Sequence, residues 1–240
     1  MLLFPFVQQY RNTQLNRLSA YHLSVCMHGL QYTCRVPDVE TLIEVYRLKL
    51  YHQLSRFLPK QGDVVIDVGA NIGEYTLVVA KAVGPQGRVI AFEPNQSALA
   101  LLKKNVHSNR ADNIVVIPSA VADQKGTVSI YTFPGTNITD SMLPLTSTYY
   151  LAPAITLDAA LSREKRIDII KMDIEGGEYR ALQEARTVLQ KKPRLIMELH
   201  TPMIRRQVLA FLSSVGYRQV YECVLKQNEL WLGYFEPASF

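Results

Sequence analysis

Val64-Val-Ile-Asp-Val-Gly-Ala-Asn-Ile-Gly-Glu-Tyr-Thr76 is an apolar run that leads into a glycine-bearing turn and then into a helical pattern. A second apolar run, Arg88-Val-Ile-Ala-Phe92, follows the helix and ends in Glu93. A strand, a glycine turn, a helix, a second strand and an acid form the layout of a nucleotide-binding βαβ unit. The acid matters because a carboxylate at that strand end can accept hydrogen bonds from both hydroxyls of a ribose. The sequence therefore predicts a nucleoside-like ligand on an α/β domain.

The turn itself reads Asp67-x-Gly69-x-Asn71-x-Gly73, which differs from the G-x-G-x-x-G of dinucleotide sites. In those sites the helix N-terminus receives a pyrophosphate. Here an acid precedes the first glycine, so the turn suits a ligand with a positive end and no phosphate. S-adenosylmethionine has an amino acid head, a sulfonium and an adenosine, and it fits. Two alternatives stay open: a tight turn without a ligand, and a nicotinamide-dependent oxidoreductase, which should have the phosphate-type spacing.

Further apolar runs recur along the chain, with helical patterns between most of them. We expect strands at 63–68, 88–93, 113–118, 167–173, 194–199 and 217–222, and helices at 97–108 and 178–190. Continuously apolar strands that alternate with helices indicate a parallel sheet covered on both faces. We also expect strands at 127–131 and 148–155 around a polar loop.

The end of the chain predicts a hairpin, formed by Tyr217–Val224 and Glu229–Phe235. Together these elements predict an α/β fold, a doubly wound, mostly parallel, seven-stranded Rossmann-like sheet with an antiparallel C-terminal hairpin. That arrangement is the usual plan of class I methyltransferases.

The first 60 residues contain no strand-turn-helix unit. We expect residues 1–60 to form an N-terminal helical extension and residues 61–240 to form the main domain. Within the extension the pattern predicts a short helix at 8–20, a strand at 32–36 and a helix at 39–58. Asp38 would cap the last of these helices and Pro59 would end it.

Composition limits the choice of partners and compartment. The net charge of +5 is scattered along the chain, and no block of like charges indicates a nucleic-acid partner. Three cysteines without metal-ligand spacing favour reduced thiols and a cytoplasmic location. The apolar N-terminal run is too short for a membrane span and lacks the features of a signal peptide. We expect it to pack on the body or on another subunit, which would make a homo-oligomer.

A second chemical constellation is Ile167-Asp-Ile-Ile-Lys-Met-Asp-Ile-Glu-Gly-Gly-Glu178. A buried strand ends in Asp173 and Glu175, and side chains two apart on a strand point the same way. Both carboxylates would lie at the C-terminal edge of the sheet, where open α/β sheets bind ligands. Such a pair could act as a base or hold a divalent cation through oxygen ligands. The alternative is capping of the following helix, which would occupy Glu178 in particular.

The next strand, Arg194-Leu-Ile-Met-Glu-Leu-His200, brings Glu198 and His200 to the same edge. A histidine there could accept a proton from a substrate hydroxyl, although a histidine at a strand end can also be purely structural. His200 is therefore a second candidate base.

These segments together resemble the FkbM family of S-adenosylmethionine-dependent methyltransferases. The resemblance rests on Val65–Thr76, Ala91–Asn95, Lys171–Leu182 and Glu198–His200, and it covers roughly residues 60–200. It implies an enzyme that methylates a hydroxyl oxygen on a sugar, a glycolipid, a polyketide or another natural product. The acceptor stays open because residues 1–60 and 132–156, which would shape its pocket, match nothing in this pattern.

The expected roles can be assigned residue by residue. The turn would hold the methionine end of the cofactor, Glu93 its ribose, and Ser119 and Ala120 its adenine. Asp173 and Glu175 would orient and deprotonate the acceptor, with His200 as the alternative base and the loop 136–145 as a cover. A catalytically silent cofactor-binding module and a small-molecule binding or scaffold protein are the remaining alternatives. The cofactor-binding set is Asp67, Gly69, Asn71, Gly73, Glu93, Ser119 and Ala120.

Overall fold

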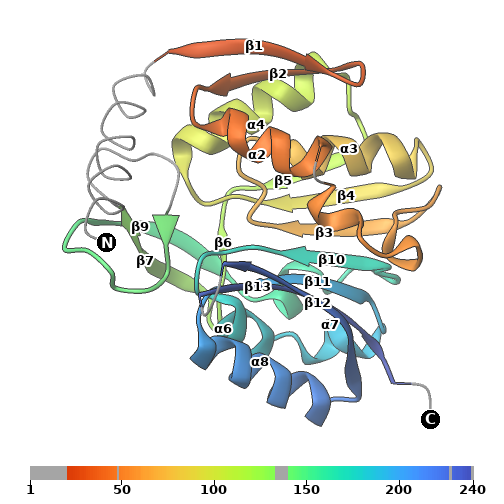
Figure 1. Cartoon of the computed structure of the whole chain (residues 1–240), viewed down its shortest axis with the longest axis vertical. Helices are drawn as coiled ribbons and strands as arrows, with labels where there is room; N and C mark the ends of the chain where they lie inside the picture. Colours follow the sequence, from red (N-terminus) through yellow and green to blue (C-terminus); the bar gives the residue numbers. More distant parts are fainter. Residues whose placement is uncertain (1–20, 48, 133–139, 227–228, 239–240) are drawn as a thin grey trace.

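The computed structural model describes residues 21–47, 49–132, 140–226 and 229–238, and its centre is a seven-stranded sheet (Figure 1). The strand order is β12-β13-β11-β10-β3-β4-β5, and β13 alone runs in the direction opposite to the other strands. The bounds are β3 Val64–Val68, β4 Arg88–Phe92, β5 Ile114–Ile117, β10 Ile169–Met172, β11 Arg194–Leu199, β12 Tyr217–Lys226 and β13 Leu230–Pro237. The predicted mostly parallel sheet with an antiparallel C-terminal hairpin is confirmed.

Helices cover both faces of this sheet because successive strand residues point to opposite sides. Val65 packs in the layer that contains α3 (Glu74–Val83), whereas Ile66 and Val68 pack in the layer that contains α6, α7 and α8. Helix α4 (Gln96–Ser108) lies on the α3 side, where Leu99 and Leu102 meet Ala91 of β4. The bounds of the other layer are α6 Glu178–Gln183, α7 Arg186–Gln190 and α8 Pro202–Ser214.

The predicted helix at 178–190 is wrong in one respect, because it is two helices with a break at Glu184 and Ala185. Asp158, in the first turn of the short helix α5 (Leu157–Ala160), explains the break. Its carboxylate accepts hydrogen bonds from the backbone N–H groups of Thr187 (2.9 Å) and Val188 (2.8 Å) and so caps the start of α7. A distant side chain therefore fixes a new helix start that the apolar spacing does not reveal.

A second, smaller sheet stands beside the main one, with the order β6-β9-β7-β8 (Figure 1). The predicted strands at 127–131 and 148–155 are confirmed as β7 and β9, and part of the expected polar loop is the short strand β8. The expected cover 136–145 lies partly outside the described residues. The bounds are β6 Ala120–Val121, β7 Gly126–Thr132, β8 Asp140–Ser141 and β9 Tyr149–Ile155.

The extension before the main domain is not mainly helical in its described part. It consists of the hairpin β1 (His22–Met27) and β2 (Leu30–Arg35), helix α2 (Asp38–Tyr46) and the 3-10 turns η1 (Leu50–His52) and η2 (Ser55–Phe57). The strand expected at 32–36 is confirmed as part of β2, and the helix expected at 8–20 lies outside the described residues.

The helix expected at 39–58 ends twelve residues early, at Tyr46. Lys49 adopts a positive φ of 49°, which an α-helix cannot contain. The apolar spacing misleads because Tyr51 and Phe57 are buried against the domain core all the same. Asp38 also does not cap: Pro37 occupies the cap position, and the Asp38 carboxylate pairs with the guanidinium of Arg35 at 2.7 Å.

Candidate active site

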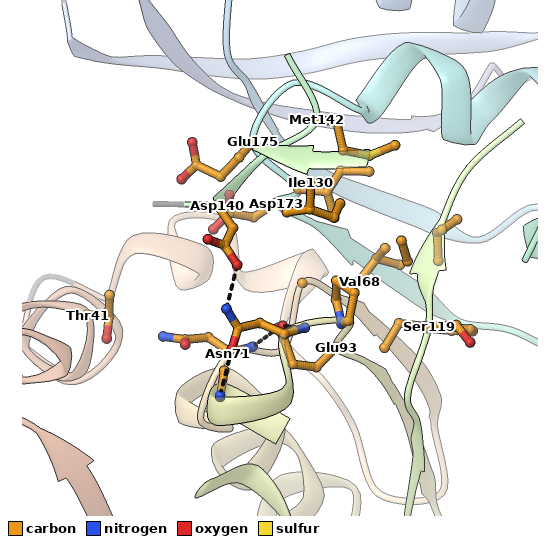
Figure 2. A pocket seen from close by; sticks show the side chains of 18 residues that line it. Thr41, Val68, Asn71, Glu93, Ser119, Ile130, Asp140, Met142, Asp173 and Glu175 are labelled. Carbon is orange, nitrogen blue, oxygen red and sulfur yellow. Dashed lines mark hydrogen bonds between the residues drawn. The ribbon is translucent and has the colours of Figure 1, made fainter. Parts of the chain in front are cut away.

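A cavity lies at the C-terminal ends of β3, β4 and β10, where the small sheet closes it (Figure 2). The structure places five of the predicted cofactor-binding residues in its wall, together with two of the predicted catalytic residues. Figure 2 shows Asn71 and Glu93 on one side and Asp140, Asp173 and Glu175 on the other. The predicted residues in the wall are Gly69, Asn71, Glu93, Ser119, Ala120, Asp173 and Glu175.

The remaining two residues of the predicted turn, Asp67 and Gly73, lie behind this wall. Asp67 is fully buried; its Oδ2 accepts a hydrogen bond from the Thr76 hydroxyl (2.5 Å), and its Oδ1 lies 3.4 Å from Lys171 Nζ. Burial raises the pKa of Asp67 above its usual value, and this effect outweighs the lowering by Lys171 and by the Thr76 hydrogen bond. Asp67 therefore ties the turn to the neighbouring strand and does not present a carboxylate to the cavity.

Gly69 is required by a close contact inside the protein. Its φ is +83°, and a Cβ at this position would lie 1.8 Å from the carbonyl oxygen of Asp173. No side chain fits there, with or without a ligand. Gly69, which suggested a cofactor-binding turn, is therefore also needed for the turn to pack against the residue that follows β10.

Glu93 ends β4 and is held by backbone donors of two segments. Its Oε2 accepts from the Asn71 N–H and its Oε1 from the Asn95 N–H, both at 2.8 Å. Burial raises its pKa to about 7, although these two backbone hydrogen bonds lower it. Each carboxylate oxygen keeps a second lone pair, so Glu93 can still accept two ligand hydroxyls.

Asp140 is a cavity residue that sequence reasoning missed. Its Oδ2 accepts a hydrogen bond from the Asn95 side chain (2.5 Å) and another from the Tyr150 hydroxyl (2.8 Å). It comes from the polar stretch that the sequence pattern treated as a loop, and only the pairing of β8 with β7 brings it to Glu93's side of the fold. No local signal marks it.

Asp173, Glu175 and His200 meet at the expected edge. The Nε2 atom of His200 lies 3.3 Å from Glu175 Oε2 and 3.7 Å from Asp173 Oδ1. Asp173 and Glu175 do not share a side because they alternate along a strand, as the sequence suggested. Strand β10 ends at Met172, and Glu175 has a positive φ of 51°. A turn after the strand, closed by Gly176 and Gly177, brings the carboxylates together.

The other imidazole nitrogen of His200, Nδ1, lies 2.8 Å from Oε1 of the fully buried Glu178. Burial acts to lower the pKa of His200, but its hydrogen bonds to Glu175 and Glu178 outweigh burial and hold this pKa well above its usual value. Glu178 does not cap α6, whose N-cap Gly177 has no side-chain hydrogen bond; its Oε1 instead accepts from the Gly176 N–H (2.9 Å) in the preceding turn. It has the additional role of fixing the imidazole.

Lys171 is the second residue that the sequence reasoning passed over. It is buried, its Nζ donates to the Gly69 carbonyl (2.9 Å), and it lies 3.8 Å from Asp173 Oδ2. Its pKa is raised, since Asp67 and Asp173 outweigh the effect of burial. A lysine inside the apolar run 167–172 is a signal that could have identified it.

Tyr51 and Glu198 complete the buried polar layer. The Tyr51 hydroxyl donates to Glu198 Oε1 (2.6 Å) and lies 3.3 Å from Asp173 Oδ2. Burial and the nearby Asp173 raise the pKa of Glu198 to about 8. Tyr51 belongs to the extension, so the extension contributes directly to the site.

An acidic cleft adjoins the cavity and shares Thr41, Asp173 and Glu175 with it. Its remaining charged wall comes from the extension, from β11 and from the C-terminal hairpin. Burial and the neighbouring carboxylates of Glu40, Asp173 and Glu175 raise the pKa of Glu44 in this wall. The other ionisable residues of the cleft are Glu40, Glu198, His200, Lys226 and Glu229.

In the described part of the chain, no helix combines the length and the apolar character that crossing a bilayer demands.

Comparison with known proteins gives both sequence relatives and structural neighbours. The chain is 24% identical over 209 residues to the hexuronic acid methyltransferase AglP of Haloferax volcanii, which covers 85% of this chain and 81% of that protein. It is 22% identical over 198 residues to the methyltransferase sdnD of Sordaria araneosa, covering 68% of this chain and 72% of that protein.

Solved structures with the same fold include an S-adenosylmethionine-dependent methyltransferase from Aquifex aeolicus. Its TM-score is 0.51 at 18% identity, with 83% of this chain and 96% of that chain covered. The fibrillarin of Aeropyrum pernix, solved with bound S-adenosyl-L-methionine, has a TM-score of 0.53 at 13% identity, with 90% and 83% covered. The family model of the FkbM methyltransferase domain matches residues 67–219, well over half of the sequence, and the chain belongs to this methyltransferase family.

Proposed function

We propose that this chain transfers the methyl group of S-adenosylmethionine to a hydroxyl oxygen of a sugar or a related natural product. One observation supports this assignment above the others: Asp173 and Glu175 stand on the boundary between the cavity and the acidic cleft. Family membership supports a methyltransferase with this donor. The cavity then holds the donor, and the cleft holds the acceptor.

The donor would lie along the ends of β3, β4 and β5. Glu93 accepts the two ribose hydroxyls, because its carboxylate faces the cavity with free lone pairs. Ser119 and Ala120 lie toward the adenine and Gly69 toward the methionine end, as the sequence suggested. Asp67 and Gly73 contribute by holding the turn, since they lie behind the wall.

Methyl transfer is an in-line displacement at the methyl carbon of the sulfonium. The acceptor oxygen forms the new C–O bond, the C–S bond breaks, and the hydroxyl proton passes to a carboxylate. The donor is already activated, so alignment and removal of that proton are what the protein must supply. Asp173 and Glu175 touch both compartments, whereas His200 lines only the cleft. The carboxylates are therefore the nearer proton acceptors.

The relative AglP is named for methylation of a hexuronic acid, which supports a sugar acceptor. Methyl transfer to a hydroxyl also explains why carboxylates gather at this boundary, which a silent cofactor-binding module would not need. The phosphate-type glycine spacing of a nicotinamide enzyme is missing from the turn.

Two measurements test the proposal. Calorimetry with S-adenosylmethionine, its demethylated product and NAD identifies the cofactor, and tight NAD binding without S-adenosylmethionine binding would refute the donor assignment. Release of the demethylated product is then followed with hexuronic acids, neutral hexoses and amino sugars. Donor binding without transfer to any hydroxylated acceptor in a broad panel would favour the silent module.

A further inference from the structure

We propose that Asp173, Glu175 and His200 form a binding site for one divalent metal ion at the boundary between the cavity and the acidic cleft. Their ligand atoms, one oxygen from each carboxylate and one imidazole nitrogen, all lie within 4.8 Å of one another. Two carboxylates and an imidazole, approached from an open cleft, give three protein ligands and leave positions for other oxygen atoms.

The separations agree with a single ion. Two ligands at about 2.1 Å from one ion lie about 3.0 Å apart at a right angle and about 3.6 Å apart at 120°. His200 Nε2 is 3.3 Å from Glu175 Oε2 and 3.7 Å from Asp173 Oδ1, close to this range. The Glu175 side chain is 38% exposed, so it can adjust to the ion without disturbing the core.

The histidine is oriented in the way that metal ligands are. Glu178 Oε1 takes the Nδ1 side of the ring at 2.8 Å, which leaves Nε2 directed at the two carboxylates. A carboxylate behind a ligating imidazole fixes the tautomer and ring plane and raises the basicity of the ligand. A carboxylate that only capped a helix would not need to contact a histidine.

A separate observation concerns the charge of Glu178. Its side chain is fully buried, and its Oε2 has no hydrogen-bond partner within the described residues. A buried carboxylate with a bare oxygen is costly unless a positive charge stands nearby. A divalent ion on the far side of the same imidazole would supply that charge in place of the Nε2 proton that His200 carries when no ion is bound.

For the chemistry of the site, this inference rests on the proposed function, whereas metal binding itself does not. An ion at the boundary would bind the acceptor hydroxyl together with an adjacent oxygen, such as a neighbouring hydroxyl or carboxylate. It would also let an anionic sugar enter a cleft that otherwise repels it. The acceptor class is therefore one with two neighbouring oxygen atoms.

The experiment measures metal binding directly on the full chain after treatment with a chelator. Mn²⁺ is titrated by calorimetry and by the loss of its free electron-spin signal, with no cofactor or acceptor present. We expect one ion per chain. Asp173→Asn and His200→Ala should each weaken binding by at least about tenfold, and Glu178→Gln by about 10–100-fold, the usual effect of removing an outer partner.

Glu40→Gln is the matched control, because Glu40 is an exposed acid of the same cleft outside the ligand set. It should change Mn²⁺ affinity by no more than about twofold. Equal weakening by Glu40→Gln and Asp173→Asn would mean diffuse attraction to an acidic surface and would overturn the site. Absence of binding by the unaltered chain at millimolar Mn²⁺ and Zn²⁺ would overturn it as well.

Circular dichroism establishes that each variant is folded, and Asp173→Asn, which keeps the size of the side chain, decides the matter if His200→Ala does not fold. S-adenosylmethionine binding measured on the same samples separates this inference from the proposed function. Donor binding and methyl transfer by a chain that binds no Mn²⁺ would refute the metal site alone. Metal binding without donor binding would refute the proposed function alone.

Discussion

Replacement of Glu93 by glutamine is the sharpest test of the donor site. The carboxylate is 7% exposed and accepts two backbone hydrogen bonds, from Asn71 and Asn95. Glutamine has nearly the same shape but only one acceptor oxygen, so it cannot serve two backbone donors and two ribose hydroxyls together. Hydrogen bonds to a charged acceptor contribute about 1.5–3 kcal/mol each. Loss of one such bond should weaken S-adenosylmethionine binding at least tenfold, since 1.4 kcal/mol is one decade.

The pH dependence of cofactor binding adds a second, independent readout for Glu93. In the cofactor-free protein the pKa of Glu93 is raised to about 7 by burial, and only the ionised form accepts from both ribose hydroxyls. The affinity should therefore rise as pH increases through about 7 and should be roughly tenfold weaker at pH 6 than at pH 8. In Glu93→Gln this rise should disappear.

The sign of the stability effect follows from the same pKa. A carboxyl whose pKa is higher in the folded protein than its usual 4.5 stabilises the fold below pH 4.5, and this contribution is lost as pH rises through about 7. Urea unfolding of the cofactor-free protein should show this loss, and Glu93→Gln should reduce it. Calorimetry at a series of pH values supplies the affinities. An unchanged dissociation constant in the variant, with the same pH profile as the unaltered chain, would refute a ribose contact at Glu93.

Three further changes test other parts of the site. Asp173→Asn should lower turnover by about 10²-fold or more while S-adenosylmethionine affinity measured by calorimetry stays within about threefold; normal turnover would exclude Asp173 as the base. Lys171→Met leaves the fully buried Asp67 without its cation and should reduce the free energy of unfolding in urea by about 3–5 kcal/mol, and a loss below 1 kcal/mol would contradict that ion pair. Gly69→Ala should prevent folding, judged by circular dichroism, because a Cβ would lie 1.8 Å from the Asp173 carbonyl oxygen; a folded variant would show that the end of β10 can move.

The sheet could be predicted because its strands are continuously apolar and separated by helical patterns. Such strands are buried on both faces, so their sequences report burial directly. The helix after β10 was predicted as continuous, whereas the Asp158 carboxylate accepts hydrogen bonds from the Thr187 and Val188 N–H groups and starts a second helix there. Within the extension, the helix expected at 39–58 was predicted too long, because Tyr51 and Phe57 are buried by tertiary contacts that helical spacing happens to imitate.

The candidate site could be predicted where its residues follow strands directly. Glu93, Asp173 and His200 each come after a recognisable apolar run, and parallel strands bring such positions to one edge. Asp140 and Tyr51 could not be found this way, since one belongs to a short edge strand and the other to the extension. The metal requirement, a homo-oligomer, a cytoplasmic location and independence from nucleic acid stay predictions.

Lys171 joins the glycine turn after β3 to Asp173 after β10. In the parallel pairing of β10 with β3, Lys171 stands opposite Asp67. From that position a single ammonium group binds the Gly69 carbonyl and lies within ion-pair distance of both Asp67 and Asp173. A shift of the glycine turn would therefore move the Lys171 ammonium group relative to Asp173. A movement of Asp173 would likewise change the position of the ammonium group that binds the Gly69 carbonyl. Under the proposed function, the register between these two neighbouring strands would set the geometry between methyl donor and proton acceptor, on which an in-line transfer depends most.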